Sequence, residues 1–119
     1  MLARANRIVR GDDYRTVVRR GRRSATAHAV VSVVVRADAD PTRFGFIVSK
    51  AVGNAVTRNL VRRRLKAVAH ELVVDHPSGL DVVVRALPAA AQAGWPTLIA
   101  DVRQCFSRST SQSKGVNKA

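Results

Sequence analysis

Residues 53–66 read GNAVTRNLVRRRLK, and this stretch predicts both a helix and the kind of partner that the helix binds. Asn54, a residue typical of a helix N-cap, is followed by apolar residues at helical spacing. Five cations fall within the nine positions from Arg58 to Lys66. Like charges three or four residues apart destabilise an isolated helix by about 0.2–0.5 kcal/mol per pair. We therefore expect this helix to meet an external polyanion.

The helix is predicted to extend over residues 55–73, with Asn54 as its N-cap. Its core face is marked by apolar residues that repeat at i, i+4, i+7 and i+11, which are Val61, Leu65, Val68 and Leu72. The segment DHPSG, residues 75–79, is predicted to stop the helix.

Strands are predicted on both sides of this helix, at residues 27–36, 44–50 and 80–86, because these runs are rich in β-branched residues. Residues 38–42 form a turn or loop, so we predict that the first two strands make an antiparallel hairpin. If the second and third strands share a sheet, the helix between them makes them parallel. Gly45 predicts a bulge or a close backbone approach.

Two further helices are predicted at residues 12–20 and 96–108, the first with Asp12 as its N-cap and Gly21 as its closing residue. The inward face of the last helix is expected to hold Leu98, Ile99, Val102, Cys105 and Phe106.

The whole chain, residues 1–119, is expected to form a single domain, because its 119 residues at 46% hydrophobic content supply one core. Residues 1–11 are expected to form a basic arm, and the polar segment 109–119 a disordered tail. The order helix, strands, helix, strand, helix predicts an α+β fold. We expect a small two-layer sandwich with a mixed sheet of about four strands and a βαβ crossover.

The charge of the chain favours nucleic acid as a partner. Twenty-one Lys and Arg against eight Asp and Glu give a formal net charge of +13. An anionic membrane is the weaker alternative, because no apolar run approaches the ~20 residues of a spanning helix and the N-terminus lacks the apolar core of a signal peptide. The single cysteine, Cys105, fits a reducing cytoplasm, where we expect the protein to reside.

The sequence offers no recognisable catalytic or metal site. The three histidines have no ligand-like spacing to one another or to Cys105, which is expected in the core. Asp38 and Asp40 lie in a proline-containing loop and are expected to form turns. Tyr14 has two open interpretations, a core aromatic or a stacking platform for a nucleobase.

Residues 48–66, VSKAVGNAVTRNLVRRRLK, resemble the signature of the protein subunit of bacterial ribonuclease P. That family carries a Lys-x-x-Gly-x-Ala-x-x-Arg-Asn block at the start of a basic helix, and the block is present here from Lys50 to Asn59. The layout of the remaining elements is similar over essentially the whole chain.

The resemblance implies a protein cofactor of a catalytic RNA that removes the 5′ leader of precursor tRNA by Mg²⁺-dependent hydrolysis. The magnesium would be held mainly by the RNA subunit, and no protein residue would be catalytic or bind metal. The protein would bind the single-stranded leader in a cleft on its sheet, while its basic helix faces the RNA subunit. The family also implies a left-handed crossover, an exception to the usual rule.

Carried over to this chain, the resemblance assigns RNA binding to Lys50, Asn54, Arg58, Asn59, Arg62, Arg63 and Lys66. It assigns the leader cleft to Tyr14, Val18 and Ser32. Leu60 stands where the family often has Arg, and some members have aromatic residues at the positions of Val18 and Ser32. Stacking adds about 1–3 kcal/mol per base where it occurs, so we expect leader binding here to depend more on phosphate contacts.

The alternative function is that of a non-catalytic RNA-binding protein, such as a small ribosomal protein. The scattered carboxylates argue against a protein-only nuclease.

Overall fold

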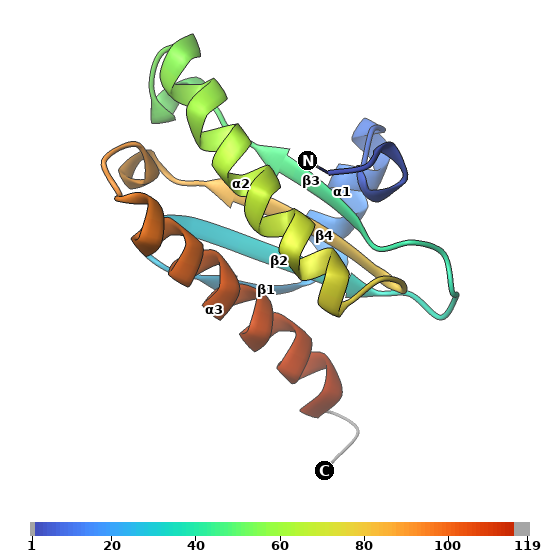
Figure 1. Ribbon diagram of the computed structural model, residues 1–119. Helices are drawn as coiled ribbons and strands as arrows, with labels where there is room; N and C mark the ends of the chain where they lie inside the picture. The colour runs from blue at the N-terminus through green and yellow to red at the C-terminus, as the bar shows by residue number, and fades with distance from the viewer. Residues whose placement is uncertain (1, 116–119) are drawn as a thin grey trace.

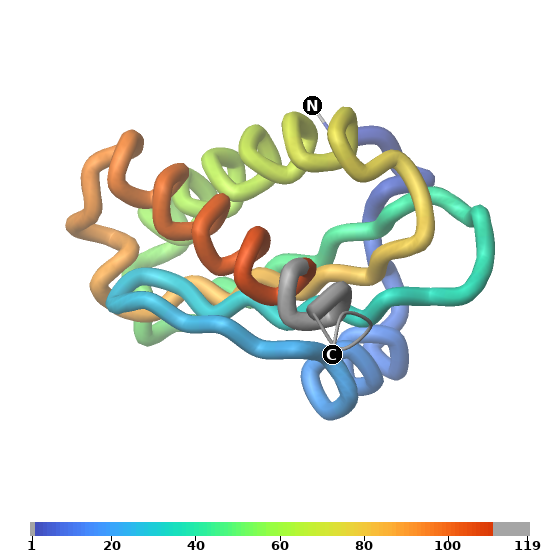
Figure 2. Tube along the Cα trace, turned by 90° about the horizontal axis from the view of Figure 1, so that it is seen from below, coloured from blue at the N-terminus to red at the C-terminus, as the bar shows by residue number. Residues whose placement is uncertain are grey.

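The computed structural model describes residues 2–115, which form a mixed four-stranded sheet with helices on both faces (Figure 1). The helices and strands, in chain order, are α1 Gly11–Arg20, β1 Arg22–Ala25, β2 Ala29–Val35, β3 Arg43–Ile47, α2 Ala55–Asp75, β4 Leu80–Ala86 and α3 Trp95–Gly115. Helices α2 and α3 cover one face of the sheet, and the shorter α1 lies on the other (Figure 2). The predicted α+β fold with a mixed four-stranded sheet is confirmed, and α1 adds to the predicted two layers on the second face of the sheet.

The strand order is β1-β2-β4-β3, with β4 antiparallel to β2 and parallel to β3. The parallel crossover through α2 is therefore confirmed, while its left-handed sense stays a prediction. The predicted hairpin between the strands at 27–36 and 44–50 is wrong, because β4 lies between them. β4 is buried at six of its seven positions, and a strand buried on both faces is suited to the centre of a sheet.

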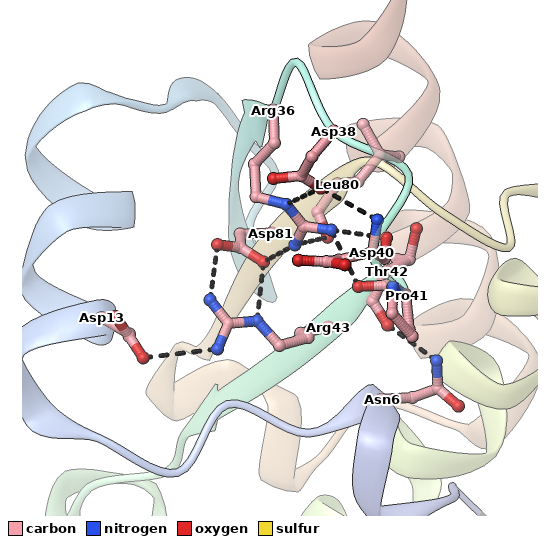
Figure 3. A network of polar contacts seen from close by, with 10 residues as sticks. All are labelled: Asn6, Asp13, Arg36, Asp38, Asp40, Pro41, Thr42, Arg43, Leu80 and Asp81. Atoms are coloured by element: carbon pink, nitrogen blue, oxygen red, sulfur yellow. Dashed lines mark hydrogen bonds and ion pairs between the residues drawn. The ribbon is translucent and has the colours of Figure 1, made fainter.

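A buried carboxylate fixes the connection from β2 to β3, which passes the start of β4 (Figure 3). Asp81 on β4 is only 8% exposed, and it accepts hydrogen bonds from both Arg36 and Arg43. The Arg43 Nη2 to Asp81 Oδ2 distance is 2.8 Å. This hydrogen bond raises the pKa of Arg43 above its ordinary value. Because the raised pKa keeps Arg43 charged, this contribution to stability is present at neutral pH and is lost only as the pH rises through the raised pKa, in strong alkali. The Asp38 carboxylate accepts a hydrogen bond from the Asp40 backbone, which confirms the predicted turn.

The main core lies between the sheet and the two long helices. The four predicted core residues of α2 are all buried, as are Leu98, Val102, Cys105 and Phe106 of α3. Asn54 caps α2 as predicted, because its side-chain oxygen accepts a hydrogen bond from the Thr57 backbone at 2.9 Å. The core contacts fix α2 to the rest of the fold from Val61 to Leu72.

Both terminal predictions need correction. Residues 1–11 do not form a free arm within the described part, because Leu2 and Ile8 are buried and the Ile8 backbone donates to the Phe44 carbonyl at 2.9 Å. The disordered tail predicted from residue 109 is wrong up to Gly115, where α3 ends. Ser109 and Thr110 are buried, and the Ser109 hydroxyl donates to the Val31 carbonyl of β2 at 3.4 Å. Residues 116–119 lie outside the described part of the chain.

The start of α1 also differs from its prediction. The N-cap is Arg10, without a side-chain cap, and Asp12 lies in the first turn, where it pairs with Arg15. Gly21 closes the helix as predicted, but at φ −71° rather than in the left-handed region. A Cβ at Gly21 would lie 2.5 Å from the Val17 carbonyl oxygen, so glycine is required there by close approach.

Candidate nucleic-acid interface

The face of the sheet that carries α1 is only partly covered. Cross-strand register places Arg23, Ser32, Val83 and Gly45 in one row. Val17 of α1 packs against Val83 in this row, and the Tyr14 ring lies against Gly45. The next row consists of Ala25, Val30, Arg85 and Ile47. All members of that second row keep part of their surface open to solvent, and Val30, Arg85 and Ile47 line a hollow beside Val18 of α1, which we call the groove.

Tyr14 is held in place by the edge strand β3. A Cβ at Gly45 would come within 2.5 Å of the tyrosine ring, so the predicted close backbone approach at this glycine is confirmed. The Tyr14 hydroxyl accepts a hydrogen bond from the Phe46 backbone at 3.2 Å. The ring is therefore fixed and half-buried, with one part in the packing of α1 and the other at the surface.

A hollow of about 210 Å³ connects Tyr14 to the basic helix. Its lining includes Arg62 and Lys66 of α2, together with Arg7 from the N-terminal segment. The structure therefore brings together one predicted leader-cleft residue and two predicted RNA-binding residues that lie about fifty positions apart in sequence. Three cations and an aromatic ring around one hollow suit a nucleotide, whose phosphate and base they can contact together.

A second hollow brings the other two predicted cleft residues together. It measures about 70 Å³ and is lined by Val18, Arg23, Val30, Ser32, Ile47, Val83 and Arg85. Arg23 and Arg85 were missed by the sequence analysis. No local pattern marks them, because their position beside Val18 depends on the register of three strands and on the placement of α1.

The predicted RNA-binding residues of the basic helix differ in how free their side chains are. Lys50, Asn59 and Arg63 are exposed. Arg58 is half-buried, and its Nε donates to the Gly53 carbonyl at 3.2 Å. The Asn54 oxygen is used in the helix cap. These last two residues thus also maintain the start of the helix.

Two other charged residues of α2 are engaged with α3. Arg64, which the sequence analysis did not assign to RNA, lies over the Trp95 ring at 5.8 Å. Glu71 pairs with Arg103 of α3 rather than with a cation of its own helix. Within residues 2–115, no carboxylate forms an ion pair with Arg58, Arg62, Arg63 or Lys66, so their mutual repulsion is not relieved inside the protein.

The potential catalytic and metal-ligating side chains are dispersed over the described residues. The part of the chain from residue 2 to 115 contains no group of three or more His, Cys, Asp or Glu residues that could hold a metal ion. His28 pairs with Asp101, and burial raises the pKa of the Cys105 thiol, which makes it a poor nucleophile at neutral pH. Among the same residues, no helix is long and apolar enough to cross a membrane.

Comparison with known proteins gives a consistent result. The family model described as Ribonuclease P matches residues 2–110. The ribonuclease P protein component of Clavibacter michiganensis is 55% identical over 108 residues, which cover 91% of this chain and 96% of that protein. The corresponding protein of Kocuria rhizophila is 50% identical and covers 90% of this chain and 94% of its own length.

Solved structures show the same fold. The RNase P protein of Staphylococcus aureus superposes with a TM-score of 0.77 at 25% identity, covering 87% of this chain and 94% of that one. The RNase P protein of Thermotoga maritima has a TM-score of 0.71 at 19% identity and covers 82% of this chain and 92% of its own, a likeness of fold alone.

Proposed function

The chain belongs to the ribonuclease P protein family, and we propose that it helps the catalytic RNA of that enzyme remove the 5′ leader of precursor tRNA. In this proposal the groove beside α1 binds the single-stranded leader, and the exposed cations of α2 contact the RNA subunit. The protein acts in the bacterial cytoplasm and supplies no catalytic residue of its own.

The observation that supports the proposal most directly is the hollow that joins Tyr14 to Arg62 and Lys66. A ring that can stack on a base and cations that can neutralise phosphates are the two requirements for binding a single strand. Their position between the groove and the basic helix allows one protein to contact a leader and a structured RNA at the same time.

Magnesium enters the proposal through the RNA. The residues described here do not fit a protein-bound ion, because their carboxylates are scattered and Asp12, Asp81 and Asp101 are engaged by Arg or His side chains. We assign the Mg²⁺ that activates water to the phosphates of the RNA subunit, as the family implies. The contribution of the protein is then to position the leader and to reduce electrostatic repulsion between the two RNAs.

The test is reconstitution with a ribonuclease P RNA on precursor tRNA at low magnesium concentration. We expect the protein to stimulate cleavage at the mature 5′ end and to cleave nothing without the RNA subunit. Binding without stimulation would instead favour a non-catalytic RNA-binding protein. Metal-dependent cleavage by the protein alone would contradict the proposal.

A further inference from the structure

Arg85 occupies an unusual place in the sheet. β4 is a central strand that is buried at its other six positions, and Arg85 is the one exposed residue within it. Its register partners on the two neighbouring strands are Val30 and Ile47, both half-buried and apolar. A valine at this position would suit the strand better than arginine, because β-branched residues pack well on a pleated surface.

No structural partner accounts for this arginine. Within residues 2–115, no hydrogen bond or ion pair engages the guanidinium of Arg85, and the same is true of Arg23 on β1. By contrast, Arg43 on the same face is tied to Asp81 and Asp13. The two unpaired guanidiniums both line the small hollow that also contains Val18 and Ser32.

The position of this hollow relates it to the proposed path of the leader. Ile47, beside Arg85, is the last residue of β3, and the chain continues from there to Lys50 and the start of the basic helix. A single-stranded leader that lies in the groove beside α1 would pass over Arg85, which lines the hollow there.

We propose that Arg85, with Arg23 beside it, is a phosphate-binding determinant of the leader groove. The inference rests on the proposed function and deepens it. In this chain Val18 and Ser32 stand at groove positions that are aromatic in some members of the family. The groove therefore offers no aromatic ring at these positions on which a base could stack. Arg85 supplies a charged fork that holds a leader phosphate in a bidentate contact. Leader recognition at this point is then strongly salt-dependent and indifferent to base identity.

The experiment compares holoenzymes reconstituted with wild-type protein, Arg85→Val, Arg85→Lys and the control Arg108→Ala. Arg108 is an exposed cation on α3, on the other face of the sheet, and its loss changes the net charge by the same amount as Arg85→Val. Dissociation constants are measured for precursor tRNA and for the same tRNA without a leader, over a series of salt concentrations. Thermal unfolding of each free protein checks the fold.

Arg85→Val is expected to weaken binding of the leader-bearing tRNA about tenfold, the loss of one charge-assisted contact. Binding of leaderless tRNA should be unchanged. The slope of log affinity against log salt should become shallower by about 0.7, the contribution of one single-strand phosphate. Arg85→Lys should keep the wild-type slope because it keeps the charge, and Arg108→Ala should behave as wild type. The melting temperature of Arg85→Val should be equal to or above that of the wild type.

Two negative outcomes are distinguishable. If wild-type holoenzyme prefers the leader-bearing tRNA and Arg85→Val does so equally, the role of Arg85 is wrong while the proposed function stands. If wild-type holoenzyme binds both tRNAs equally, leader binding itself is wrong, and the inference fails with it. Should Arg85→Val unfold, Arg85→Gln provides the same comparison with a polar side chain of similar length.

Discussion

At the scale of single residues, the contact between Gly45 and Tyr14 decides where the proposed leader groove begins. The tyrosine ring occupies the space that a side chain on β3 would fill, and its hydroxyl satisfies the Phe46 backbone on an open sheet edge. An edge strand otherwise presents unpaired backbone groups to solvent. One glycine therefore makes room for an aromatic ring that serves packing on one side and the groove on the other.

We predict that Gly45→Ala destabilises the protein by about 1–3 kcal/mol, the usual effect of overpacking. The new methyl group would lie 2.5 Å from the Tyr14 ring, so the ring or the strand must move. Chemical denaturation measures the change, and leader affinity should fall with it. Gly11→Ala is the matched control, because its Cβ would meet only an Arg15 atom at 3.7 Å. A Gly45→Ala protein as stable as the wild type would contradict this placement of Tyr14.

At the scale of elements, different sides of α2 serve packing and RNA binding. Val61, Leu65 and Val68 face the core, Arg64 stacks on Trp95 at one flank, and Arg63 is exposed. The hydrophobic period of the helix was enough to predict its core face, and the residue type of Asn54 was enough to predict its cap. It could not show which cations are engaged, because the ring beneath Arg64 comes from α3.

This separation predicts opposite results for two adjacent arginines. Arg63→Ala should weaken binding of the RNA subunit about fivefold, a loss of about 1 kcal/mol, without changing the free energy of unfolding. Arg64→Ala should instead lower that free energy by about 0.5–1 kcal/mol, the value of an exposed cation–π contact, and leave RNA affinity unchanged. Filter binding and thermal unfolding of both variants measure the two effects. The reverse assignment would show that the exposed side of α2 does not face RNA.

At the scale of the whole molecule, the sequence predicted the helices and the parallel crossover better than it predicted strand order. The predicted hairpin assumed that consecutive strands pair, whereas β4 lies between β2 and β3 and Asp81 fixes the connection around it. Strand β1 was missed, because RRSA has two arginines and no apolar run. The same long-range register hid Arg23 and Arg85. Functional residues that belong to a local sequence motif could be predicted from the sequence. Residues that only the register of the sheet brings together could not.

At the same scale, we propose that the two sides of the protein bind two different RNAs. The groove beside α1 is proposed for the leader and the exposed side of α2 for the RNA subunit. Figure 2 shows α1 and α2 on opposite faces of the sheet, so probes attached to them start from opposite sides. The chain permits selective labelling, because its single cysteine, Cys105, is buried and its raised thiol pKa keeps it poorly reactive.

The most direct measurement is therefore local hydroxyl-radical cleavage from a tethered iron chelate in the reconstituted complex. The chelate is attached to Val18→Cys in the groove or to Ala67→Cys, an exposed position on α2 that leaves every cation in place. We predict strand cuts in the precursor leader from position 18 and in the RNA subunit from position 67. Wild-type protein treated with the same reagent should cut neither. Cuts in the same RNA from both positions, or none in the leader from position 18, would contradict the account.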